Sequence, residues 1–107
     1  MNIRSTFEDG RLTIYFEGEL DHHAARDALR QIEERIDATC PRETVLDFKG
    51  LTFMDSSGIA VVVKAYKRTS QVGGKLSVTN LGPQPRRVLQ AAGVERFVRV
   101  IVTPKEV

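Results

Sequence analysis

The sequence of 107 residues contains one cysteine, two histidines, no tryptophan and no long apolar run. A single cysteine cannot form an intramolecular disulfide, and Cys40 with two histidines does not supply the ligand set of a zinc site. A membrane-spanning helix requires about 18 consecutive apolar residues, so no membrane span is expected, and the first residues lack the apolar stretch of a signal peptide. We therefore expect a cytoplasmic protein without a metal site, folded as one domain over residues 1–107.

Several motifs of enzymes and nucleotide-binding proteins are also absent. No Gly-x-Ser-x-Gly motif presents a nucleophilic serine, and nothing in the sequence indicates an oxyanion hole. There is no Gly-x-x-x-x-Gly-Lys phosphate loop, and the Gly-Gly-Lys of residues 73–75 precedes a predicted strand where a phosphate loop would precede a helix. We expect no catalytic residues, no cofactor and no enzymatic activity, while incidental contact with a nucleotide stays open.

The composition is that of a globular protein, with 41% hydrophobic and 28% charged residues. The net charge of +2 is unevenly distributed, since residues 1–55 hold 7 basic and 12 acidic side chains and residues 56–107 hold 9 and 2. Such asymmetry can mark a surface for nucleic acid or a charged partner, or simply place opposite charges side by side in one small domain. Five residues prompt the nucleic-acid interpretation: Lys64, Lys67, Arg68, Arg86 and Arg87. With few aromatic residues for base stacking, we expect no direct nucleic-acid binding.

Hydrophobic periodicity predicts the element order ββαβαβαβ. Residues 2–17 form a hairpin around an Asp-Gly turn, and residues 44–48, 75–80 and 97–102 form three further strands. Helices are expected from the N-cap Asp21 to before Pro41, from a start within residues 56–59 to the Gly-Gly pair at 73–74, and from the prolines at 83 and 85 to Gly93.

The strand–helix–strand units favour parallel pairing through right-handed crossovers, whereas the hairpin is antiparallel. The predicted fold is therefore α/β, a single domain with a mixed sheet of four or five strands flanked by helices. The strand at residues 44–48 belongs at the centre of the sheet. One core is expected to contain Leu46, Phe48, Ile59, Val62, Val63, Leu76 and Val78.

The stretch Phe-Met-Asp-Ser-Ser-Gly at residues 53–58 lies between a predicted strand and a predicted helix. The first N–H groups of a helix lack intrahelical partners, and the helix dipole favours negative charge there. A structural interpretation is that Asp55, Ser56 or Ser57 caps the helix while Gly58 permits close packing. A functional interpretation is that an exposed serine here accepts a phosphoryl group, because a phosphate at a helix N-terminus is favourably placed.

A second junction, Gly-Glu-Leu-Asp-His-His at residues 18–23, precedes the first predicted helix. Loops at the carboxyl ends of neighbouring parallel strands gather at one end of a sheet, so Asp21 and Ser56 are expected to lie close together. His22 and His23 are adjacent at a helix start and point in different directions. We therefore expect them to be solvated rather than to bind a metal.

Together these residues resemble the STAS domain of bacterial anti-sigma factor antagonists. The resemblance is carried by the junction at 18–23, Asp-Ser-Ser-Gly-Ile at residues 55–59 and Gly-Gly-Lys-Leu at 73–76, which occur in the family's order and span essentially the whole chain. It implies a mixed sheet flanked by helices and a partner-switching role without catalysis. Pro85 and Gly82 depart from the residues usual in the family, which bears on which partner is recognised more than on the fold.

In the family that the chain resembles, the antagonist binds an anti-sigma factor that is also a serine kinase, and thereby releases a sigma factor. Phosphorylation ends this binding, and a serine phosphatase restores it. The resemblance implies phosphorylation at Ser56, with Ser57 as the alternative acceptor. It also implies a partner-binding surface consisting of Asp21, His22, Asp55, Ser56, Ser57 and Gly58. An alternative within the same fold is a constitutive binding module, as a STAS subunit of a membrane transport system or of a larger signalling complex.

Overall fold

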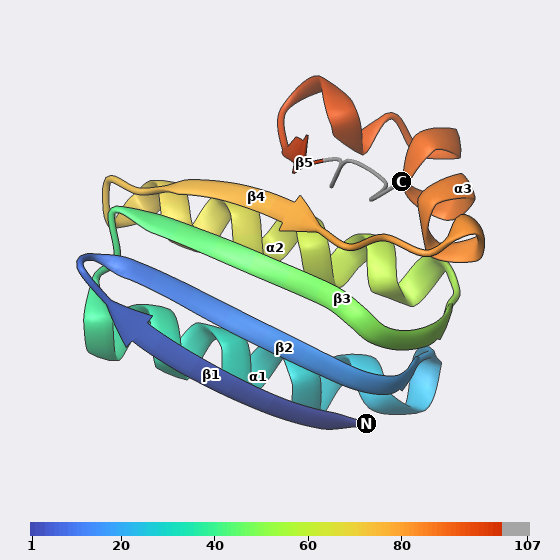
Figure 1. Ribbon diagram of the computed structural model, residues 1–107, viewed down its shortest axis with the longest axis horizontal. Helices are drawn as coiled ribbons and strands as arrows, with labels where there is room; N and C mark the ends of the chain where they lie inside the picture. Colours follow the sequence, from blue (N-terminus) through green and yellow to red (C-terminus); the bar gives the residue numbers. More distant parts are fainter. Residues whose placement is uncertain (102–107) are drawn as a thin grey trace, which may run out of the picture.

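The structure is a computed structural model that describes residues 1–101, and it has the predicted order ββαβαβαβ (Figure 1). The strands are β1 (Asn2–Glu8), β2 (Arg11–Leu20), β3 (Glu43–Met54), β4 (Lys75–Thr79) and β5 (Arg99–Ile101). The helices are α1 (His22–Thr39), α2 (Ser56–Gln71) and α3 (Pro83–Ala91), with a short 3₁₀ turn, η1 (Val94–Arg96), before β5. Of the last predicted strand, Val102 lies outside the described residues.

The five strands form one mixed sheet in the order β1-β2-β3-β4-β5. The β1–β2 hairpin is antiparallel, and every other pair is parallel, which confirms the predicted sheet with β3 at its centre. Asp9 and Gly10 both have positive φ, 52° and 79°, as the expected two-residue hairpin turn requires. The carboxyl ends of β2 and β3 therefore lie beside each other, with Leu20 in register with Met54.

Helices α1 and α2 lie side by side on one face of the sheet, and α3 packs near the carboxyl-terminal part of β3 (Figure 1). The core fills the space between this face and the two helices. Its fully buried members include Leu12, Ile14 and Phe16 of β2, Leu46 and Phe48 of β3, and Ile32 and Ile36 of α1. Among the described residues, no helix is both long and apolar enough to cross a membrane.

The buried face of α2 differs from the predicted one. Val62 is buried as expected, whereas Ile59 is half-buried at the margin of the core, and Val63 is half-buried and lies outside the core cluster. The buried residues of α2 are Gly58, Val61, Val62, Ala65 and Thr69. Small residues on this face let the helix pack closely. The sequence analysis predicted the buried face from large apolar side chains, and this pattern does not identify small buried residues.

Candidate functional site at the carboxyl end of the sheet

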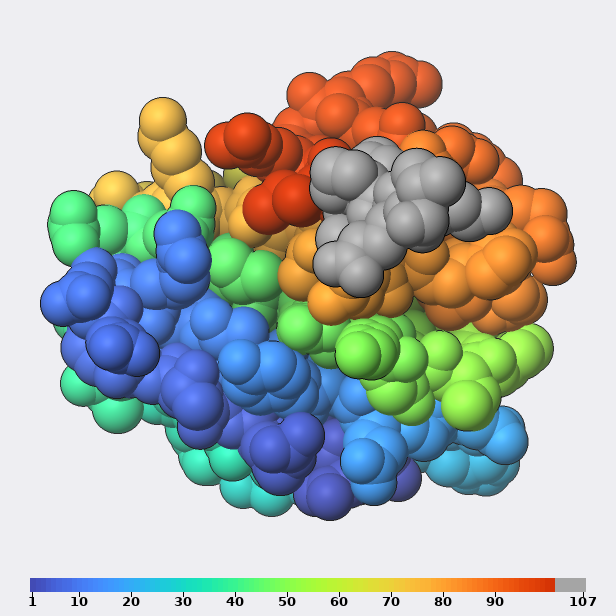
Figure 2. Space-filling view, viewed as in Figure 1, coloured from blue at the N-terminus to red at the C-terminus, as the bar shows by residue number. Residues whose placement is uncertain are grey.

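Three segments far apart in the sequence meet at one end of the molecule: the β2–α1 junction, the β3–α2 junction and the start of α3. In the space-filling view their blue, green and orange surfaces adjoin at the right-hand side (Figure 2). The parallel pairing of β2 with β3 produces this arrangement, because both strands end there and each is followed at once by a helix. The site is therefore built from the N-terminal ends of α1, α2 and α3.

Asp55 connects the first two of these segments. Its Oδ1 accepts a hydrogen bond from the backbone N of Ser57 at 2.8 Å, which makes Asp55 the N-cap of α2. Its Oδ2 accepts a second hydrogen bond from the backbone N of His22, the first residue of α1, at 3.0 Å. The backbone N of Asp55 also donates to the carbonyl of Leu20 at 3.3 Å. The expected proximity of the two junctions is thus realised through one half-buried carboxylate.

Asp21 is the N-cap of α1, as predicted. Its Oδ1 accepts a hydrogen bond from the backbone N of Ala24 at 3.0 Å, and its side chain is half-buried. His22 and His23 are both exposed, with their rings edge to face at 5.9 Å between centroids. Within residues 1–101, no group of three or more His, Cys, Asp or Glu side chains is arranged to hold a metal ion.

The two candidate acceptor serines differ in exposure. Ser56, the first residue of α2, is exposed, whereas Ser57 is half-buried between the two helices. In the part of the chain that the structure describes, neither hydroxyl forms a hydrogen bond. The backbone N–H groups that follow are already bonded to Asp55, that of Ser57 to Oδ1 and that of Gly58 to the carbonyl at 3.0 Å.

Gly58, which the sequence analysis included in the partner-binding surface, is buried. A Cβ at this position would lie 2.4 Å from Cγ and 3.0 Å from Sδ of Met54, and 3.3 Å from Cδ2 of Leu20. Met54 and Leu20 are themselves fully buried, and they leave no room for a side chain. The close-packing interpretation of Gly58 is therefore confirmed, and its contribution to the site is to bring α2 against the ends of β2 and β3.

Gln84 is a residue of the site that the sequence analysis did not identify. Its side-chain amide binds both polar groups of the Met54 backbone: Oε1 accepts from the Met54 N–H at 2.9 Å, and Nε2 donates to the Met54 carbonyl at 2.7 Å. The pairing of β4 with β3 ends at Thr79 and Asp47, so Gln84 occupies the place of a neighbouring strand beside the end of β3. This contact ties the first turn of α3 to the residue before Asp55.

Phe53 was also not assigned a role, and it is exposed by 39% at the carboxyl end of β3. Its partner across the β2–β3 ladder is Glu19, which is exposed as well. Both Thr52 and Phe53 are exposed, so the alternation of buried and exposed positions is broken here. That break is visible only once the strand has been placed in the sheet.

The STAS domain family model matches residues 2–107. The chain belongs to the STAS family. An anti-sigma F factor antagonist from Paenibacillus polymyxa is 34% identical over 102 residues, which cover 94% of this chain and 87% of that protein.

Two solved structures of the anti-sigma factor antagonist SpoIIAA are also similar to this STAS protein. In its unphosphorylated form, SpoIIAA has 26% identity and a TM-score of 0.82, over 97% of this chain and 90% of the other. In its phosphorylated form, from Bacillus, it has 26% identity and a TM-score of 0.73, over 97% and 93%. The STAS resemblance of the sequence and the fold that it implies are both confirmed.

Proposed function

We propose that this STAS protein is an anti-sigma factor antagonist whose unmodified form binds an anti-sigma factor with serine kinase activity and so releases a sigma factor. Phosphorylation of Ser56 by that partner ends the binding, and a serine phosphatase restores it. The observation that carries the proposal is the exposed, unbonded Ser56 hydroxyl, directly after the Asp55 cap that joins α1 to α2. The similarity to anti-sigma factor antagonists, one of them solved in a phosphorylated form, supports it.

Exposure favours Ser56 over Ser57 as the acceptor. A kinase must bring the hydroxyl to the γ-phosphate of ATP, and the half-buried Ser57 lies between the two helices. Ser56 projects at the helix start without a hydrogen bond that would have to break first. We therefore assign the modification to Ser56 and keep Ser57→Ala as the matched control.

The hydrogen bonds around Asp55 explain how a phosphate would act. The N–H of Ser57 is already bonded to the Asp55 carboxylate and that of Gly58 to the Asp55 carbonyl, so a phosphate could bind them only by displacing these two acceptors. The added charge of about −1.5 to −2 therefore stays at the surface, next to Asp55, where it faces the partner. A coupling of about 1–3 kcal/mol between modification and binding corresponds to about 5- to 150-fold in affinity. No large conformational change is required.

The test uses the purified anti-sigma F factor of Paenibacillus polymyxa, with ATP and mass spectrometry to locate the phosphate. The wild type and Ser57→Ala are expected to be phosphorylated at Ser56, whereas Ser56→Ala binds the partner without being modified. Ser56→Asp is expected to bind more weakly than Ser56→Ala, although one carboxylate only partly imitates a phosphate dianion. Phosphate found only on another residue, or equal affinity of the phosphorylated and unmodified proteins, would refute the switch.

A further inference from the structure

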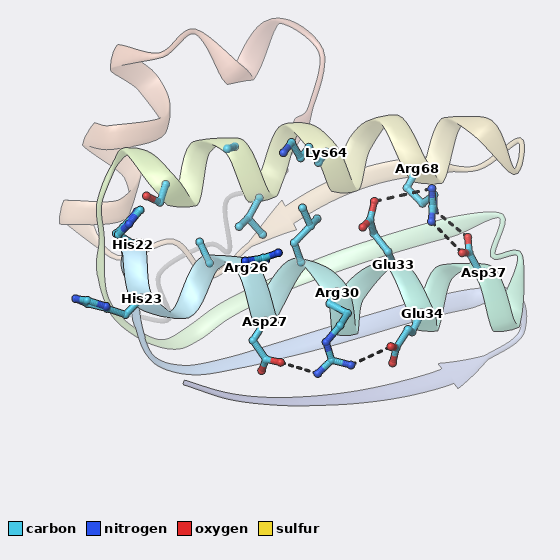
Figure 3. A pocket seen from close by; sticks show the side chains of 15 residues that line it. His22, His23, Arg26, Asp27, Arg30, Glu33, Glu34, Asp37, Lys64 and Arg68 are labelled. Atoms are coloured by element: carbon cyan, nitrogen blue, oxygen red, sulfur yellow. Dashed lines mark hydrogen bonds and ion pairs between the residues drawn. The ribbon is translucent and has the colours of Figure 1, made fainter.

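A groove of about 880 Å³ runs between α1 and α2, starting beside the candidate site at His22 and Ser57 (Figure 3). Its floor consists of small or apolar residues from both helices: Ala25 and Leu29 from α1, and Ala60 and Val61 from α2. Of these, Ala60 is exposed and Val61 is buried. The floor is therefore apolar and open to solvent, and the small side chains make it accessible to a narrow segment of another protein.

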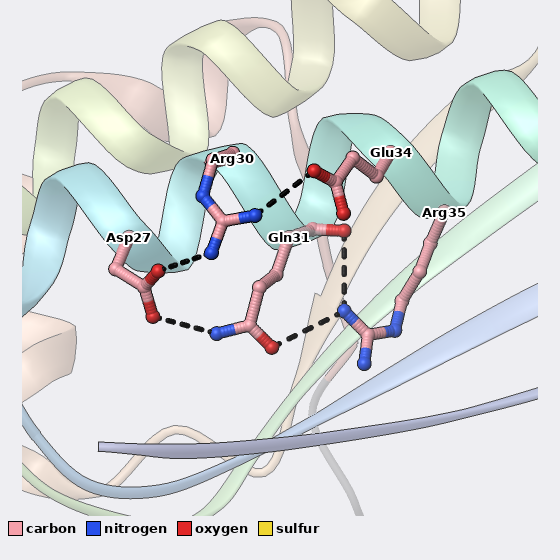
Figure 4. Close-up of polar contacts among 5 residues, drawn as sticks. All are labelled: Asp27, Arg30, Gln31, Glu34 and Arg35. Atoms are coloured by element: carbon pink, nitrogen blue, oxygen red, sulfur yellow. Dashed lines mark hydrogen bonds and ion pairs between the residues drawn. The ribbon is translucent and has the colours of Figure 1, made fainter.

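The carboxylates along this groove are all paired within the chain. Arg30 binds Asp27 at 2.6 Å and Glu34 at 2.9 Å, and this cluster on α1 also contains Gln31 and Arg35 (Figure 4). The Arg30 guanidinium lowers the pKa of the Asp27 carboxyl below its ordinary value, chiefly through their hydrogen bond. Exposed pairs of this kind contribute little stability, and because one guanidinium faces two carboxylates, the trio of Asp27, Arg30 and Glu34 keeps a net charge of −1.

Ion pairs join the two helices at the end of the groove away from the site. Arg68 of α2 binds Asp37 of α1 at 3.0 Å and lies 3.9 Å from Glu33 (Figure 3). These contacts neutralise Arg68, which the sequence analysis considered as part of a nucleic-acid surface.

Two cations nearer the site have no such partner. Arg26 of α1 and Lys64 of α2 flank the groove between His22 and the Arg68 ion pairs, and neither forms an ion pair with any residue in the described range 1–101 (Figure 3). The lining as a whole contains four basic and four acidic side chains and is neutral. The unpaired positive charge is therefore local: Arg26 lies in the second turn of α1, and Lys64 lies midway along α2.

We propose that this groove is a docking surface for an acidic amphipathic segment of the anti-sigma factor, whose apolar side contacts the floor and whose carboxylates bind Arg26 and Lys64. The inference rests on the proposed function, because it names part of the surface that the same partner uses. Charge complementarity selects the occupant: the free charges are cationic and few, and the floor between them is apolar. A nucleic acid would instead need a run of unpaired cations along the helices.

Docking in this groove also explains how a phosphate on Ser56 would weaken partner binding. Ser57 lines the groove, and Ser56 is the residue directly before it at the start of α2. A dianion on Ser56 places negative charge where the acidic segment must approach, and it competes for the cations that hold this segment. Like charges brought together at an interface are strongly unfavourable, so the partner is released without movement of either helix.

The experiment measures binding of purified Paenibacillus polymyxa anti-sigma F factor by isothermal titration calorimetry. Arg26→Glu and Lys64→Glu are compared with Lys67→Glu, which makes the same charge change on an exposed residue of α2 that does not line the groove. Each groove variant is expected to bind roughly tenfold more weakly, with a smaller dependence on salt, whereas Lys67→Glu binds like the wild type. Thermal melting checks that all three variants remain folded.

The possible outcomes separate this proposal from the proposed function. If the wild type binds and Ser56→Asp binds weakly, but the groove variants match Lys67→Glu, the docking surface is refuted and the switch stands. If the wild type does not bind the anti-sigma F factor, both the docking proposal and the proposal that this protein is a partner are refuted. Binding of a labelled DNA duplex that is lost in Lys64→Glu, with unchanged protein binding, would assign the cations to nucleic acid and also refute it.

Discussion

Replacement of Asp55 removes two hydrogen bonds with different roles. Oδ1 caps α2 through the N–H of Ser57, and Oδ2 joins the start of α2 to the start of α1 through the N–H of His22. Asp55→Ala removes both bonds. Asp55→Asn keeps an oxygen for Ser57 but turns an NH₂ group towards the N–H of His22, so that the second bond is lost. Asp21→Ala removes a cap alone, at the start of α1.

The expected losses of unfolding free energy differ between the three variants. Loss of a helix cap costs about 1 kcal/mol, and a hydrogen bond to a charged group contributes about 1.5 kcal/mol at the lower end of its range, which suits a half-buried carboxylate. We expect a loss of about 2–3 kcal/mol for Asp55→Ala, about 1.5 kcal/mol for Asp55→Asn and about 1 kcal/mol for Asp21→Ala. In a domain of this size each kcal/mol lowers Tm by about 4 °C.

Urea denaturation followed by circular dichroism measures these differences. Amide hydrogen exchange gives an independent readout, because the N–H of His22 should exchange faster in both Asp55 variants and remain protected in Asp21→Ala. The contrary result is an equal loss of unfolding free energy in Asp55→Ala and Asp21→Ala, within about 0.5 kcal/mol, with the His22 amide equally protected in both. In that case the hydrogen bond from His22 to Asp55 does not contribute to stability. The reasoning that makes Asp55 the centre of the site would then be wrong.

Three further predictions concern packing around the site. Gly58→Ala should destabilise the protein by about 1–2 kcal/mol in thermal melts, because overpacking against Met54 outweighs the better helix propensity of alanine; a more stable variant would contradict this. Gln84→Ala should leave the Met54 backbone unpaired and speed exchange of its amide, with a loss of about 1–3 kcal/mol, whereas unchanged exchange would show that water replaces the amide. Val62→Ala should lower the unfolding free energy by about 1–3 kcal/mol and Val63→Ala by less than half as much; equal losses would contradict the observed buried face.

Local patterns in the sequence determined the elements and their order. The Asp-Gly turn at residues 9–10 favours positive φ at both positions, Asp21 has the residue type and spacing of an N-cap, and Pro83 suits the first turn of a helix. These preferences act within a few residues, so a single sequence displays them. The family also followed from short motifs whose order in the chain is preserved.

The tertiary structure decided which side chains meet. The sequence left open which of three residues caps α2, and it did not show that Asp55 also binds the N–H of His22, 33 residues away. It included Gly58 in the partner-binding surface without showing that Gly58 is buried, and it did not identify Gln84, whose partner Met54 is 30 residues away. Such contacts depend on strand register and on the rotation of α2 against the sheet. Small residues set that rotation through close packing, which hydrophobic periodicity does not record.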